Sequence, residues 1–553
     1  MQLIMMGRRR TGGKRSRTGC RTCRARHVKC DETPGACRNC TSTGRRCEGY
    51  DLHRLPLQGG RGKKASTIQV QALIRNGFSW TMTSDERRCL SYFQYHTLPS
   101  LLGLFGSPLW EKLVFQVGQS EPAIFHAIVA LSAIHQDSEA RGMPMSMEEP
   151  DNSWHRFSLE QLSRAFNLLI KRRTSQDPRF CNVTLVCCLL FVLSDLLRGH
   201  YDDAFVHLQG GLAILQELKA HRQLVAPMPR EELVEQSLVA AFAHLDIMST
   251  HFGVGGPVLR IENELGDGQS ECDPTMPFQT LQDALRAFEP NFSAIFRFIS
   301  PCMYLPPEKI QSDYETLHVR QIYLWSRFNQ FIRMFKQFYS TMYDQLSLTD
   351  QRGADLIQIW ILGLSVSLKT CLVGGDLTVL HCYTPEYEMI VARTEAFLQK
   401  YPERPTISIQ CGIIPAVFHA AFACRDYTIR WQAIELLWAW PHREGVFDSN
   451  WCASLACQAL KIELLALSQK GQDPHAPTPI LTSRTSERLS IEEVLARINE
   501  HQRRVLLCER GDMGEEPFDD IDCSPLDLIE TVKCMSGWSC VRAFQAHAAR
   551  LDA

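Results

Sequence analysis

The chain of 553 residues lacks the long apolar segments of a secreted or membrane-spanning protein. Its first residues, Met1–Met6, are too few for the apolar core of a signal peptide and are followed at once by Arg8–Arg10. The apolar run Val183–Leu193 is far shorter than the ~20 residues that cross a bilayer, so it predicts a buried core helix and no membrane partner. Alternating strand patterns are few, and no glycine-rich phosphate loop follows a strand.

Net charge is also nearly absent, yet the charges are unevenly distributed. The formal net charge is −2. The first fifty residues contain thirteen Lys and Arg against three Asp and Glu, which gives +10. The remaining residues contain 46 basic and 58 acidic side chains, which gives −12. A basic N-terminal segment on an acidic body predicts a polyanionic partner for that segment.

Cysteine, in contrast, is plentiful, and six of the 22 cysteines form two matching triplets. They are Cys20, Cys23, Cys30, Cys37, Cys40 and Cys47. Each triplet has the spacing C-x2-C-x6-C, and zinc accepts four tetrahedral thiolate ligands at roughly 2.3 Å. Six thiols fill two such shells only if two sulfurs bridge both ions. The symmetric choice of bridges is Cys20 and Cys37, so the sequence predicts two Zn²⁺ ions as cofactors.

The cysteine-rich segments Gly19–Glu32, Cys37–Cys40 and Gly44–Cys47 resemble the fungal binuclear zinc cluster, a family of DNA-binding transcription regulators. The resemblance implies a loop and a short helix from each triplet, with the first and fourth cysteines bridging the metals. It further implies a nuclear, sequence-specific regulator of RNA polymerase II genes that binds double-stranded DNA. Disulfides would suit a secreted protein, which no signal peptide supports here. A metal buffer or a generic zinc knot would explain the cysteines but not the basic residues around them.

In that family, the bases are contacted by the third and fourth residues after the second cysteine, which are Arg26 and His27 here. Arg26 can donate in a bidentate manner to guanine O6 and N7 in the major groove, whereas His27 stands where the family usually has Lys or Arg. The resemblance implies a CGG-like half-site, the one common in the family. The other basic side chains predict phosphate contacts, which position the protein without specifying sequence. These are Arg21, Arg24, Lys29, Arg38, Arg45 and Arg46.

The basic residues before the cluster predict a nuclear import signal, or a disordered arm along phosphates, and both interpretations remain open. They are Arg8, Arg9, Arg10, Lys14, Arg15 and Arg17. Residues 48–80 read as a linker, because Pro56 and several glycines interrupt them. No heptad pattern is sustained between Asp51 and Trp80, so no coiled-coil dimer is predicted there.

The remainder of the chain shows helical periodicity, which makes this a mainly α protein with a small two-zinc module and a large all-helical domain. The predicted organisation is a basic arm at 1–19, the cluster at 20–47, the linker at 48–80 and the helical domain at 81–553. A helix is expected to begin at Pro122 and another to end near Gly199, with Gly210 and Gly211 allowing close helix packing. Further helices are expected near 154–169, 202–219, 232–252, 316–340, 353–372, 386–401, 411–439, 451–469 and 490–508.

The motifs Asp85–Leu90, Ser120–Ala123, Ala130–His135 and His207–Leu212 occur in this body in that order. Together they resemble the fungal-specific transcription factor domain, which implies an all-helical regulatory domain. Its expected partners are a second subunit, identical or different, and the transcription machinery or co-regulators.

No catalytic constellation accompanies the scattered histidines of the body, so no enzyme is predicted. His126, His135 and His207 are expected to be bonded core or boundary residues. None of the sixteen cysteines outside the cluster forms a C-x2-C pair. The alternative of another class is a helical metabolite- or partner-binding protein, or an enzyme-derived body, that the zinc module tethers to chromatin.

Overall fold

Helices provide most of the regular structure, as predicted, and the three strands of the described part have two residues each. The computed structural model describes residues 18–50, 55, 82–105, 110, 120–144, 152–175, 177, 179–222, 232–250, 277–302, 305–373, 377–469 and 489–510. Its backbone contacts divide the chain into two compact units. The first is Met1–Thr97, Leu113–Asp137 and Glu149–Val183, and the second is Leu98–Lys112, Ser138–Glu148 and Thr184–Ala553.

The first unit contains two short helices of the cysteine-rich segment and then longer ones. These are α1 Arg21–Ala25, α2 Arg38–Thr41, α4 Ser84–Tyr92, the π-helical turn η1 Phe93–Thr97, most of α7 Pro122–Ala140, and α8 Ser153–Lys171. A capping box starts α4, because Glu86 Oε2 accepts from Thr83 N at 2.8 Å while Thr83 Oγ1 accepts from Glu86 N. Asn152 caps α8 by accepting from the amides of Trp154 and His155.

Two helix boundaries predicted from proline and glycine are confirmed. Pro122 opens α7, where its missing N–H leaves no helical hydrogen bond unmade. Gly199, with a φ of 75°, follows the end of α9, Phe180–Leu197. Within the described residues, α9 is the one helix with the length and composition to cross a membrane, and 72% of it is buried inside the protein.

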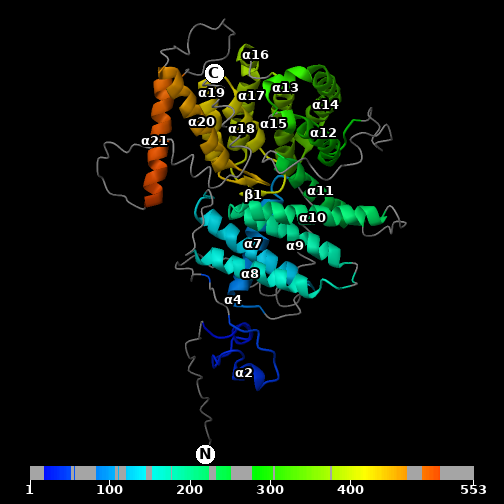
Figure 1. Ribbon diagram of the computed structural model, residues 1–553, viewed down its shortest axis with the longest axis vertical. Coiled ribbons are helices and arrows are strands. Elements are labelled where there is room, and N and C mark those ends of the chain that lie inside the picture. Colours follow the sequence, from blue (N-terminus) through cyan, green and yellow to red (C-terminus); the bar gives the residue numbers. More distant parts are fainter. Residues whose placement is uncertain are drawn as a thin grey trace, which may run out of the picture. The chain divides into compact units, whose positions relative to one another are not determined.

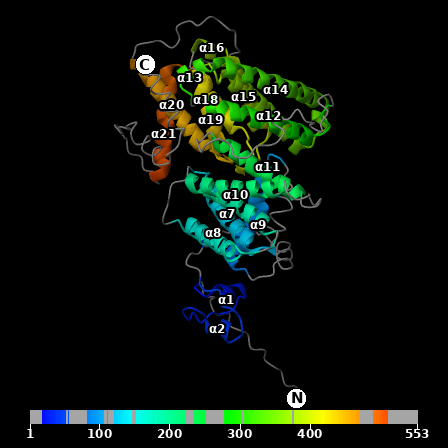
Figure 2. The same cartoon turned by 45° about the vertical axis from the view of Figure 1, so that its right-hand side comes forward.

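Most of α9 belongs to the second unit, together with the remaining helices. These are α5 Leu98–Leu101, α10 Tyr201–Arg222, α11 Glu232–Ser249, α12 Leu281–Cys302, α13 Pro307–Ser312, α14 Tyr314–Met342, the 3-10 turn η5 Tyr343–Gln345, α15 Leu348–Thr370, α16 Leu377–His381, α17 Thr384–Lys400, α18 Ile414–Ala423, α19 Tyr427–Ala439, α20 Ser449–Gln469 and α21 Ile491–Arg510. The helices α12, α14 and α15 lie side by side in both views (Figure 1, Figure 2). Their shared core is aromatic, with Phe288 packed on Phe331 and on Trp360.

One predicted helix is wrong in its extent, and several helices were not predicted. The helix expected at 411–439 is two helices, α18 and α19, because Asp426 accepts from the amides of Thr428 and Ile429 and starts a new helix. The helices that were not predicted are α4, α5, α12, α13 and α16. The longest of them is α12, which contains Pro290 and Pro301. Proline disfavours a helix interior, so the local sequence opposes this helix, and its apolar face against α14 and α15 stabilises it.

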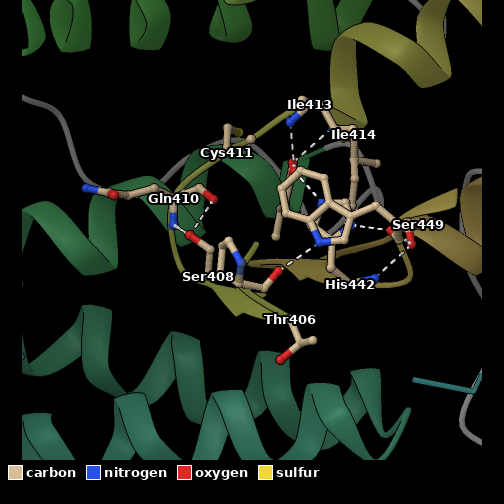
Figure 3. Close-up of polar contacts among 12 residues, drawn as sticks. Thr406, Ser408, Gln410, Cys411, Ile413, Ile414, His442 and Ser449 are labelled. Atoms are coloured by element: carbon tan, nitrogen blue, oxygen red, sulfur yellow. Dashed lines mark hydrogen bonds and ion pairs between the residues drawn. The ribbon is translucent and has the colours of Figure 1, made fainter. Parts of the chain in front are cut away.

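A small sheet joins the ends of several helices in the second unit. Its strands are β1 Ile407–Ser408, β2 Arg443–Glu444 and β3 Phe447–Asp448, with β1 parallel and β3 antiparallel to the central β2. The carboxylate of Glu444 accepts from the amides of Ile413 and Ile414 at 2.7 and 3.0 Å, which satisfies the first donors of α18 (Figure 3). The buried Glu444 therefore ties the sheet to the start of α18.

Candidate metal centre and nucleic-acid interface

The six cysteines of the two triplets meet because each triplet starts a short helix. Cys20 is the N-cap of α1 and its Sγ accepts from Cys23 N at 3.4 Å. Cys37 is the N-cap of α2 and its Sγ accepts from Cys40 N at 3.3 Å. One helical turn thus directs both sulfurs of each C-x2-C pair to the same side.

The sulfur atoms form two overlapping groups of four. One group is Cys20, Cys23, Cys30 and Cys37, the other is Cys20, Cys37, Cys40 and Cys47, and the sulfurs of each lie within 4.8 Å of one another. Cys20 and Cys37 belong to both groups and are 3.5 Å apart. Four sulfurs that surround one zinc ion at roughly 2.3 Å lie about 3.8 Å from one another, so the donor set fits two ions.

The electrostatics of these thiols also favours bound cations. Burial raises the pKa of both Cys20 and Cys37 well above the usual value, so a cation is needed to keep these sulfurs as thiolates. Cys30 and Cys47 are also buried or half-buried, yet backbone amides that donate to their sulfurs lower their pKa. These donors include Cys20 N to Cys30 and Cys37 N to Cys47, at 3.3 and 3.4 Å.

Equivalent residues seventeen positions apart support the two halves in equivalent ways. In one half, the side chain of Asn39 donates to the carbonyl of Lys29 at 2.7 Å. In the other, the hydroxyl of Thr22 donates to the carbonyl of Arg46 at 3.1 Å. Asp31 in addition accepts from the amide of Asn39 at 3.0 Å, and hydrogen bonds from Thr33 and from this amide lower the pKa of Asp31. The prediction from the cysteines did not find these supporting side chains, although the seventeen-residue repeat points to them.

The two predicted base contacts lie at the C-terminal end of α1. Arg26 is the C-cap, and His27 follows it with a φ of 57°, in the left-handed region. The amides of His27 and Val28 donate to the carbonyls of Arg24 and Cys23, which is a Schellman motif. In the second half, Gly44 occupies the equivalent left-handed position. His27 is exposed, and Arg26 is half-buried with an Nη1 atom that has no hydrogen-bond partner among the described residues.

The predicted phosphate contacts differ in their exposure. Lys29, Arg38, Arg45 and Arg46 are exposed, and Arg24 is half-buried. Arg21 is buried against Glu86 of α4, and its Nη2 lies 2.5 Å from Glu86 Oε1. The basic arm Arg8–Arg17 lies outside the described residues.

Two of the three histidines expected to be bonded, His126 and His135, make hydrogen bonds, whereas His207 lies near a carboxylate at a distance longer than a hydrogen bond. His126 Nδ1 lies 2.7 Å from the side-chain oxygen of Gln161, and His135 Nδ1 lies 2.9 Å from the hydroxyl of Thr97. His207 is half-buried, with Nε2 3.7 Å from Asp195. Burial raises the pKa of Asp195 to about 7, although the neighbouring Arg198 opposes this shift.

The site defines a class of protein, which is a binuclear zinc cluster module carried by a helical body. The model of the fungal Zn(2)-Cys(6) binuclear cluster domain matches residues 18–55, and that of the fungal specific transcription factor domain matches residues 88–435. The chain therefore belongs to the fungal transcription factors that combine these two domains, and it is a DNA-binding transcription regulator.

Three relatives illustrate how far the similarity extends. The chain is 23% identical over 570 residues to the aspercryptin biosynthesis cluster-specific transcription regulator atnN of Emericella nidulans, which covers 84% of this chain and 90% of that protein. It is 25% identical over 211 residues to transcription regulator lscL of Purpureocillium lilacinum, covering 36% of this chain and 49% of that protein. It is 62% identical over 45 residues to transcriptional regulatory protein moc3 of Schizosaccharomyces pombe, covering 8% of this chain and 9% of that protein. No solved structure matches the chain.

Proposed function

We propose that the six cysteines of the two triplets bind the two Zn²⁺ ions with Cys20 and Cys37 as bridges, and that this centre positions α1 in the major groove. The observation that carries the proposal is the pair of overlapping sulfur groups that share these two cysteines. Bound zinc supplies the folding energy of a segment too short to form an apolar core.

Within this arrangement, Arg26 and His27 contact bases, and the exposed basic side chains contact phosphates. The place of Arg26 at the C-terminal end of α1 supports its role, because a guanine offers two acceptors to a guanidinium. Lys29, Arg38 and Arg45 are exposed enough to reach phosphates. Arg21 and Arg24 belong to the same predicted set, and Arg21 would first have to leave Glu86.

The chain acts in the nucleus, where the basic residues before the cluster serve as an import signal or lie along DNA. Its helical body provides dimerisation and contacts to co-regulators, and it has no catalytic activity. The alternative, a metabolite-binding body tethered by the cluster, differs in one measurable respect. Deleting the body would then abolish ligand binding and leave expression of the target genes unchanged.

The similarity to atnN along most of both chains supports a more specific proposal. That relative is named a regulator specific to a biosynthesis gene cluster. We infer that this chain likewise controls a group of neighbouring biosynthesis genes. Immunoprecipitation of bound genomic DNA tests this, because binding spread over unrelated housekeeping promoters would contradict it.

The zinc assignment is tested by counting ions. The purified chain should bind two Zn²⁺ ions, and a chelator should unfold the cluster. Cys23→Ser removes a ligand from one ion and should weaken one site, whereas Cys20→Ser removes a shared ligand and should weaken both. Cys89→Ser, a buried thiol outside the cluster, is the matched control and should retain two ions. A stoichiometry of one, or equal losses in the Cys20 and Cys23 variants, would contradict the bridging arrangement.

A further inference from the structure

The first turn of α4 contacts the cluster through two consecutive side chains. Glu86 Oε1 accepts from Arg21 Nη2 at 2.5 Å, and Arg87 Nη2 lies 3.2 Å from His27 Nε2. Arg21 is the first residue of α1, and His27 directly follows its C-cap. Two adjacent residues of α4 therefore bind both ends of the short helix that is predicted to read DNA.

The next turn of α4 is fixed to the helical part of the first unit. Ser132 of α7 donates its hydroxyl to the carbonyl of Cys89 at 2.6 Å. The guanidinium of Arg88 lies over the ring of Trp154 in α8, 4.9 Å from its centroid. The contact therefore links the cluster to α7 and α8 through α4.

Arg21 is the cation that balances the buried Glu86. Glu86 is 0% exposed, and its Oε2 is already used by the capping box. His126 Nδ1 lies 3.9 Å from Oε1, but burial lowers the pKa of this histidine to about 4, so its ring is neutral at pH 7. A buried carboxylate that loses its cation is strongly unfavourable, so the pair resists separation.

The same contact withdraws Arg21 from solvent. Its side chain is 5% exposed and lies between Glu86 and Glu48, whose Oε2 is 3.8 Å from Arg21 Nε. Because this side chain is buried, a DNA phosphate can bind the guanidinium only if the contact with Glu86 opens, and the two anions then compete for its N–H donors.

His27 is occupied in a way that opposes its predicted role. A guanidinium can only donate, so His27 Nε2 must accept from Arg87. That nitrogen then carries no proton and cannot donate to a guanine acceptor. Contact of His27 Nε2 with a guanine requires Arg87 to move away.

We propose that Glu86 and Arg87 form an intramolecular clamp, the α4 clamp, that competes with DNA for Arg21 and His27. The proposal rests on DNA binding by the cluster. The chain with the clamp engaged binds DNA weakly, and release of the clamp permits tight binding. A ligand or partner that moves α4 within the helical body would thereby raise the affinity for DNA without touching the DNA-binding surface.

Glu86→Gln is the informative variant. Glutamine retains the capping box but removes the charge that holds Arg21. We expect the full-length variant to bind a short duplex, selected for binding to the wild-type chain, roughly fivefold tighter or more. The matched control is Glu121→Gln, which breaks an ion pair of 2.5 Å with Arg172 in the same unit. Its affinity should equal that of the wild type.

In an Arg21→Ala background, Glu86→Gln should give no gain in affinity for the duplex, since the clamp has lost its main target.

Side-chain NMR of the wild-type chain gives a second readout that needs no variant. On addition of the duplex, the guanidinium signal of Arg87 should shift, because this side chain leaves His27 when the clamp opens. An unchanged signal there, or Glu86→Gln affinity equal to that of the wild type, overturns the clamp while DNA binding stands. Failure of every chain, wild type included, to bind any selected duplex overturns the proposed function and the clamp with it.

Discussion

At the residue scale, the two halves of the cluster differ at the residue that follows the end of each short helix. The two helices end in the same motif, with Gly44 in the left-handed position of the second and His27 in that of the first. A side chain there costs roughly 1 kcal/mol that glycine avoids, and histidine is among the residues that tolerate this region best. If His27 contacts bases as proposed, this strain is accounted for, because a glycine would present no side chain beside Arg26. Local strain at this position therefore supports a role in recognition.

Variants of two arginines, Arg26 and Arg45, should distinguish base recognition from phosphate binding. Arg26→Ala should cost about 1–3 kcal/mol on the preferred duplex and relax specificity at one base pair. Arg45 is an exposed residue of the second half. Arg45→Ala should weaken binding to all duplexes alike and reduce the slope of log K against log salt concentration by about one. Binding titrations on matched and mismatched duplexes at several salt concentrations distinguish the two. A change of base preference in the Arg45 variant alone would reverse the assigned roles.

Buried histidines make the stability of the helical body depend on pH. Burial lowers the pKa of His244 to about 4, and its Nε2 accepts from Cys411 N at 2.9 Å, so the folded ring is neutral. The unfolded chain takes up this proton below pH 6.5 and the folded chain does not, so the stabilisation is complete above that pH and declines towards pH 4. At pH 5 the loss should be about 2 kcal/mol.

His244→Gln, which keeps an acceptor for Cys411, should remove this share of the pH dependence. Urea unfolding of both chains between pH 7 and pH 5 measures the difference. His419, whose pKa burial also lowers to about 4, should behave alike on substitution. Identical pH profiles for the wild type and both variants would exclude neutral buried rings as the cause.

The grouping of the six cysteine sulfurs could be predicted from the sequence, because their number and spacing allow few arrangements. Counting sulfurs predicts Cys20 and Cys37 as the shared pair, and these two cysteines belong to both groups of four sulfurs in the structure. The contact of Arg21 with Glu86 could not be predicted in this way, since 65 residues separate the two. The capping box at Thr83 and Glu86 is visible in the sequence, but nothing local indicates that the second carboxylate oxygen binds α1.

At the scale of elements, two adjacent glycines of α10 have different roles. An ideal Cβ at Gly211 would lie 2.2 Å from Phe242 Cε1 of α11, whereas a Cβ at Gly210 would have nothing within 4 Å. Gly210→Ala should stabilise the chain by about 0.5–1 kcal/mol, because alanine favours the helix. Gly211→Ala should destabilise it by about 1–3 kcal/mol, because the buried Phe242 has no room to move. Chemical unfolding should therefore give shifts of opposite sign, and a gain in both variants would show that the two helices are not in close contact.

Helix boundaries could be predicted from the sequence where a single proline or glycine marked them. Pro122 and Gly199 marked an expected start and end correctly. The break before α19 was missed because the apolar pattern continues across it, although Asp426 is a usual N-cap. The strands were not predicted, since two residues cannot display an alternating pattern. The role of the buried Glu444 could not be predicted either, because the α18 amides that it accepts from are thirty and more positions away in the sequence.

At the scale of the whole molecule, affinity for DNA should depend on the helical body in two opposing ways. The predicted linker contains no sustained heptads, so a fragment ending at Trp80 should be monomeric. That fragment also lacks Glu86 and Arg87, so the α4 clamp cannot restrain it. On a duplex with one half-site, it should therefore bind at least as tightly as the full chain.

On a duplex with two half-sites the order should reverse. Dimerisation through the helical body, or contact of that body with a second bound protein, makes binding of the second cluster intramolecular and raises its effective concentration. A single small module buries only roughly 600–1,000 Å² and gains nothing from a second site unless it dimerises. Analytical ultracentrifugation of fragment and full chain, followed by titration of each onto single and paired sites, measures both effects. A fragment that forms a stable dimer, or that prefers paired sites at one fixed spacing, would place the dimerisation element before Trp80 and not in the body.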